Sequence, residues 1–197
     1  MLIRLILTLL VAMPVIVMAD ASEGEFMGYL LGSNYQPGVH TRPQATTDGN
    51  LIMIAEKPVK PNDIAEVSLL VTAETLTIGY IDASQWFETE TEAREFGRRY
   101  ADLLRAKYPD WKFGRERMDN NMRIVEVNFD ELPYNLRLRL DEDEHNSKKM
   151  WRFSMTLGWM ADAEPAREWR NLSRSQHITA QEMGRKQLLE NADLRGL

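Results

Sequence analysis

Residues 134–159 read YNLRLRLDEDEHNSKKMWRFSMTLGW, and this stretch decides the fold. Apolar and polar residues alternate from Tyr134 to Leu140 and again from Met150 to Trp159. An alternation of period two is typical of a strand that buries one face and exposes the other. The charged residues at 141–146, between the two runs, predict a solvent-exposed turn. We therefore expect two adjacent antiparallel strands that share an apolar face.

Further strands are expected on both sides of the central pair. The candidates are 51–55, 65–71, 75–81, 112–117 and 123–129. In 75–81, Leu76, Ile78 and Tyr80 are expected on a common face. The segment 33–50 is rich in turn-forming residues and is expected to hold no regular element. Short polar links join neighbouring strands, so the sheet should be mainly antiparallel.

One long helix is predicted between these groups of strands. Residues 89–92 read TETE, which matches the sequence motif of a capping box, so a helix should begin after Thr89. Phe96, Tyr100 and Leu103 recur at helical spacing and are expected to hold the helix in place, and Pro109 ends the pattern. The sequence thus predicts an α+β fold: a mainly antiparallel sheet of about five to seven strands, one long helix packed on one face, and a short helical C-terminal segment.

The chain opens on MLIRLILTLLVAMPVIVM, in which Arg4 precedes an apolar run, and Ala19 follows as a small residue. This layout predicts a secretory signal peptide cleaved near Ala19, with a retained anchor as the alternative. The apolar run is shorter than the roughly twenty residues of a membrane-spanning helix, so we expect no stable membrane insertion after cleavage. We expect a periplasmic or secreted protein with a signal peptide (1–19), an α+β domain (20–160) and a helical C-terminal extension (161–197).

Composition argues against several classes of function. The 197 residues include no cysteine and three histidines, and the formal net charge is −6. Without cysteine there is no disulfide scaffold and no thiol nucleophile, and scattered histidines argue against structural zinc. The acidic residues 141–146 offer calcium ligands, but Asn146 and Arg152 stand where an EF-hand loop has glycine and glutamate. A negative chain is also unsuited to nucleic acid. We expect no metal, no cofactor and no nucleic-acid partner.

Three arginines form the most informative polar pattern. Arg137, Arg139 and Arg152 alternate with apolar residues in the two central strands, so they should emerge together on the face of the sheet without the helix. Arginine forks on one face can hold a carboxylate, a phosphate or an acidic partner. Alternatively, they pair across the strands with Glu126 and the acidic turn, which would make them structural.

Trp169 is the tryptophan that falls outside the predicted core. With Ala166 and Leu172 at helical spacing, it could anchor a partner, since tryptophan is enriched at interface hot spots; docking on its own domain is the alternative.

Two function classes lead after these considerations, and a structural envelope component that self-assembles is a third. The first is a small secreted binding or interaction domain without catalytic machinery, whose partner is an envelope protein or an anionic ligand. The second is a hydrolase of cell-envelope glycan that uses carboxylates, with Glu126, Asp141 and Asp143 as candidates. No G-x-S-x-G or S-x-x-K motif indicates a serine nucleophile.

Overall fold

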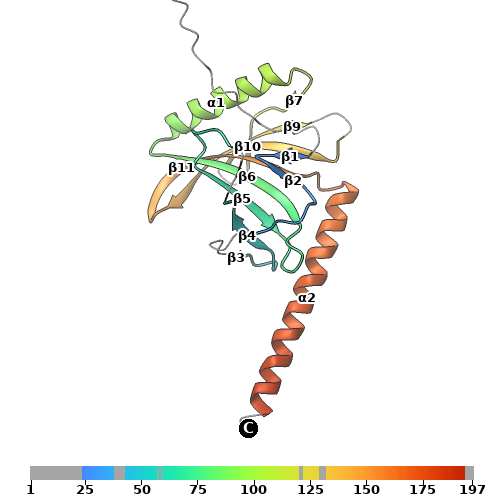
Figure 1. Ribbon diagram of the computed structural model, residues 1–197. Coiled ribbons are helices and arrows are strands. Elements are labelled where there is room, and N and C mark those ends of the chain that lie inside the picture. Colours follow the sequence, from blue (N-terminus) through green and yellow to red (C-terminus); the bar gives the residue numbers. More distant parts are fainter. Residues whose placement is uncertain are drawn as a thin grey trace, which may run out of the picture.

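A computed structural model of the chain describes residues 24–37, 43–56, 58, 60–119, 122–128 and 132–193. The predicted signal peptide and its cleavage site lie outside these residues. Within them the fold is α+β, with antiparallel sheets and two helices, as the sequence predicts (Figure 1).

The main sheet has nine strands, more than the five to seven expected. Its order is β3-β4-β5-β6-β11-β10-β9-β7, with β8 also paired to β9, and every pairing is antiparallel. The strands are β3 (Gln44–Ala45), β4 (Leu51–Ile54), β5 (Glu66–Val71), β6 (Ile78–Phe87), β7 (Lys112–Phe113), β8 (Arg117–Asp119), β9 (Met122–Asn128), β10 (Tyr134–His145) and β11 (Lys148–Trp159). A separate hairpin joins β1 (Glu25–Phe26) to β2 (Tyr29–Leu30).

The excess of strands has two local causes. The candidate 112–117 divides into the short β7 and β8, because Gly114 interrupts it and donates its amide to Glu126. The segment 33–50, expected to lack regular elements, contributes β3, which pairs with β4. That expectation was wrong because pairing to a neighbouring strand supplies hydrogen bonds that local turn propensity does not reveal.

The β10–β11 hairpin forms the centre of the sheet. Its apolar face pairs Leu136 with Leu157 and Leu138 with Met155, and all four side chains are buried. The strands continue through the acidic segment, so the turn is not at 141–146 as expected. It consists of Asn146 and Ser147, both with positive φ (52° and 62°), as a two-residue hairpin turn of this hand requires.

Helix α1 (Glu90–Lys107) lies across the apolar face of the sheet (Figure 1). The predicted capping box is present: the Glu92 amide donates to Thr89 Oγ1 at 3.3 Å, and the Thr89 amide donates to the Glu92 carboxylate at 3.1 Å. Phe96 and Tyr100 are buried, as predicted. Leu103 is 39% exposed, so its predicted burial was wrong; its neighbour Leu104 takes the place in the core.

A β-bulge changes which face one strand presents. Val71 pairs with Ile78 and Leu70 pairs with Tyr80, so Gly79 has no partner in the register. The extra residue places Tyr80 on the face opposite to that of buried Ile78. The prediction that they share a face was therefore wrong. The bulge places the aromatic ring of Tyr80 on the face of the sheet away from α1, which we call the helix-free face.

Helix α2 (Glu164–Asp193) is a single helix of 30 residues rather than a short segment, and it extends beyond the sheet at its C-terminal end (Figure 1). Its first half docks on the strand ends. Trp169 Nε1 donates to the Thr77 carbonyl at 3.0 Å, Ser173 donates to Asn50 at 2.6 Å, and Gln176 accepts from the Glu74 amide at 2.9 Å. Neither α1 nor α2, the helices of the described ranges, combines the length and apolarity needed to cross a membrane.

Candidate functional site

The helix-free face of the sheet carries the three arginines that the alternation places there. On β10 and β11, Arg137 pairs in register with Thr156, and Arg139 pairs with Ser154. Arg152 lies between Asp141 on β10 and Trp86 on β6. Residues opposite each other in antiparallel strands share a face, so all of these side chains stand on the side away from α1.

A cavity of about 360 Å³ opens on this face. Following the strand order, Ile52, Leu70 and Tyr80 form an apolar half on β4, β5 and β6. A basic half comes from β10 and β11 and contains the three arginines. We call this cavity the arginine groove; its lining is Ile52, Ser68, Leu69, Leu70, Tyr80, Asp82, Arg137, Arg139, Arg152 and Thr156.

The acidic partners of the arginines lie in part where the sequence did not indicate. Arg152 bonds to Asp82, which also accepts from the Thr156 hydroxyl. The Arg137 Nε atom lies 3.5 Å from the Glu126 carboxylate, the partner expected from sequence. The acidic segment forms neither of these pairs. Asp82 could have been suspected from its charge between Ile81 and Ala83, within an apolar strand.

Arg139 differs from its two neighbours, because its Nη2 atom contacts the Met122 sulfur at 2.7 Å and, within the described residues, it forms no ion pair; its charge acts on the Asp141 carboxyl group only electrostatically. The groove lining contains three arginines and one aspartate, so its formal charge is 3 − 1 = +2. The whole chain carries −6. The groove is thus a locally basic site on an acidic protein, which favours anions near it.

Buried polar atoms without hydrogen-bond partners gather on this face. Eight such side-chain atoms occur among the described residues, and six of them belong to the helix-free face. These six are Trp86 Nε1, Arg137 Nε, Arg139 Nε, Asp141 Oδ1, Arg152 Nε and Ser154 Oγ. Each unpartnered buried group costs about 1–3 kcal/mol, so an excess on one face requires an explanation. A ligand that accepts from the arginine Nε–H groups would supply partners for three of these six atoms, the three that belong to residues lining the groove.

Asp141 is half-buried beside Arg139 and Arg152. Burial raises the pKa of its carboxyl group, against the opposing pull of the two arginines. The other carboxylates considered for hydrolysis are placed differently: Glu126 is bound by Arg117 at 2.9 Å, and Asp143 is exposed. None of the three lines the arginine groove, so the structure does not join them in one concave site.

Trp169 is buried against its own domain, which is the alternative that the sequence left open for it. It is 8% exposed, and its ring meets that of Tyr80 edge-on with the centroids 5.9 Å apart. The indole also covers Gly79, where an added Cβ would lie 2.2 Å from the ring. Trp169 therefore supports one wall of the arginine groove through Tyr80 rather than presenting a free anchor.

The described part of the chain contains no group of three histidine, aspartate or glutamate residues placed to hold a metal ion. We compared the chain with protein-family models, with curated proteins and with solved structures, and none of the three comparisons gave a match. The chemistry of the site therefore has to be argued from its own residues.

Proposed function

We propose that this protein is a secreted binding protein whose arginine groove takes a ligand bearing a carboxylate or a phosphate. The observation that carries the proposal is the set of buried Nε–H donors on Arg137, Arg139 and Arg152 that form no hydrogen bond, in a groove of positive charge; of the three, Arg137 Nε has a carboxylate, that of Glu126, at ion-pair distance. Hydrogen bonds between guanidinium and an oxyanion are about twice as strong as neutral ones. An anion in the groove would satisfy donors that the protein itself leaves unpaired.

The surroundings of the arginines support binding rather than turnover. Arg152 and Arg137 are held by Asp82 and Glu126, so their forks have restricted positions before a ligand arrives. Prior ordering lowers the entropic cost of binding. In the described segments Arg139 forms no ion pair, and Asp141 acts on it only electrostatically, so it is the arginine of the three with the most free capacity for an anion.

A carboxylate-dependent hydrolase acting on cell-envelope glycan remains the second candidate, favoured by one observation. Burial raises the pKa of Asp141, and a carboxyl group with a raised pKa is suited to act as a general acid. The Asp141→Asn variant tests it: loss of a glycan-cleaving activity that wild type possesses would support the hydrolase, and full retention would remove Asp141 as its acid.

Calorimetric titration with succinate and with inorganic phosphate tests the binding proposal. We expect Arg139→Gln to weaken binding of the preferred anion about 10- to 100-fold, the range for a lost hydrogen bond between charged groups. Arg167→Gln, an exposed arginine on α2, is the matched control and should bind as wild type does. Equal affinity in wild type and Arg139→Gln, or no binding of either anion, would contradict the proposal.

A further inference from the structure

A second cavity, of about 400 Å³, lies on the opposite side of the sheet, beneath α1. The cavity exists because one stripe of α1 carries only small side chains. Ala93, Gly97 and Ala101 follow one another at intervals of four residues, so they form one stripe on α1. The adjacent stripe carries Phe96 and Tyr100, which fill the core. Where the small residues face β9 and β10, the helix leaves space that large side chains would occupy.

The floor of this cavity is apolar. Val125 from β9, Leu138 and Leu140 from β10, and Phe153 from β11 line it. Leu138, Leu140 and Phe153 belong to the buried core, and Gly97 lies directly over the Phe153 ring. A cavity of this size falls within the range of small-molecule sites, roughly 300–1,000 Å³. An apolar floor of this kind suits a hydrocarbon chain better than a polar ligand.

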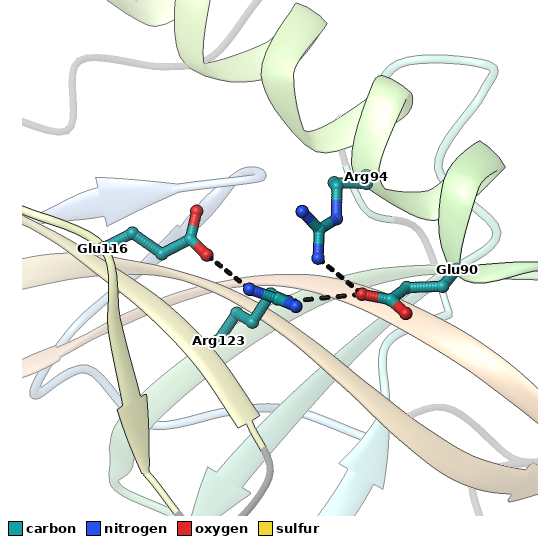
Figure 2. Close-up of polar contacts among 4 residues, drawn as sticks. All are labelled: Glu90, Arg94, Glu116 and Arg123. Carbon is teal, nitrogen blue, oxygen red and sulfur yellow. Dashed lines mark hydrogen bonds and ion pairs between the residues drawn. The ribbon is translucent and has the colours of Figure 1, made fainter.

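One wall of the cavity is formed by ion pairs between α1 and the strands. Figure 2 shows Arg94 and Glu90 of α1 reaching down toward Arg123 of β9, with Glu116 on its other side. Glu90 lies 2.6 Å from Arg94 and 3.3 Å from Arg123, and Arg123 lies 2.9 Å from Glu116. These four charges compensate one another, so this wall attracts no further anion strongly.

Arg98, an exposed residue of α1, also lines the cavity and, among the described residues, forms no ion pair and no hydrogen bond. Arg105, which lines the cavity as well, is instead paired with Asp102 at 3.0 Å. The cavity therefore combines an apolar floor with an exposed cation on α1, Arg98, that is unpaired within the described ranges, and Arg139 of β10 also contributes to its lining.

We propose that the cavity beneath α1 binds a single-chain amphiphile with an anionic head, of the class of medium-chain fatty carboxylates. The hydrocarbon chain lies on Val125, Leu138 and Phe153, and the carboxylate meets Arg98. This cavity and the arginine groove open on opposite faces of the sheet, and their linings share Arg139. Arg98, Val125 and Ala101 line this cavity and not the groove, so variants at these three positions test the two proposals separately.

Titration of the full chain with decanoate and decanol, below their aggregation concentrations, tests this assignment. We expect decanoate to bind and decanol to bind at least about tenfold more weakly, because the alcohol lacks the charge that Arg98 recognises. Arg98→Gln should remove this preference by lowering decanoate affinity to the level of decanol. Arg174→Gln, which changes an exposed arginine of α2, should leave both affinities unchanged.

Filling the cavity provides the second arm. Val125→Phe on the floor and Ala101→Leu on the helix should each reduce the affinity for both decanoate and decanol by tenfold or more, with folding checked by circular dichroism. If both filled variants fail to fold, Arg98→Gln, at an exposed position, decides the question alone. The proposal is overturned if decanoate does not bind, if Arg98→Gln binds it as wild type does, if a folded filled variant retains full affinity, or if Arg139→Gln rather than Arg98→Gln abolishes binding.

Discussion

The arginines on the two faces of the sheet differ in how their N–H donors are paired. Beneath α1, Arg94 and Arg123 share Glu90 and Glu116 in an ion-pair network whose charges compensate (Figure 2). On the helix-free face, the Nε–H groups of Arg137, Arg139 and Arg152 are buried without hydrogen-bond partners. The comparison shows that the number of arginines on a surface says little about binding. The donors that remain after internal pairing mark the candidate site.

The largest expected effect comes from the apolar face. Phe153 is buried against Phe96 and Tyr100 of α1, with ring centroids 5.5 and 6.0 Å away. Phe153→Ala should lower the free energy of unfolding by about 3–5 kcal/mol, as large-to-small core changes do. Urea unfolding followed by circular dichroism measures it. Leu103→Ala, on the exposed side of the same helix, is the control and should cost far less. Equal costs would mean that α1 is not held by this face.

The next effect concerns the pairing on the helix-free face. Asp82 and Arg152 are 16% and 20% exposed, and Asp82 also accepts from Thr156. Asp82→Asn should cost about 2 kcal/mol, because it leaves a largely buried guanidinium without its counter-charge. The same unfolding experiment measures it. Combining Asp82→Asn with Arg152→Met should recover part of the loss, and a double variant no more stable than Asp82→Asn alone would contradict the assigned pairing.

A smaller effect depends on pH. Burial raises the pKa of Asp141 in the folded protein above its value in the unfolded chain. The folded state then binds this proton more tightly, so ionisation of Asp141 lowers stability as pH rises from the acid range toward neutrality. Asp141→Asn removes that cost. We expect the variant to be more stable than wild type at pH 7, with the difference vanishing in acid. A wild type more stable at neutral pH would refute this.

The smallest effect belongs to the exposed network beneath α1. Arg123→Gln breaks contacts to Glu90 and Glu116, but these groups are well hydrated, and such pairs contribute little. We expect a change in unfolding midpoint close to the experimental error at physiological salt, and slightly larger at low salt, where screening is weaker. A large loss, comparable to that of Asp82→Asn, would show that the two faces do not differ as described.

Sequence periodicity predicted the elements whose signals are local. The alternation in β10 and β11 placed Arg137, Arg139 and Arg152 on one face, and the capping-box motif at 89–92 located the start of α1. Periodicity failed for Tyr80, because the bulge at Gly79 reverses which face the following residues of β6 occupy, and only the register with β5 reveals the bulge. It also missed the Arg152–Asp82 pair, whose members are 70 residues apart along the chain. Contacts of that kind arise from strand order, which no local pattern encodes.

The docking of α2 has a mechanical consequence. Trp169, Ser173 and Gln176 lie on one stripe of the helix, and each forms a directional hydrogen bond to a different point at the strand ends. A helix held only by apolar contacts, which have no preferred direction, could rotate about its long axis with little loss of free energy. Three hydrogen bonds at separate points are directional and resist that rotation. The sheet thus fixes the rotation of α2 about its own axis.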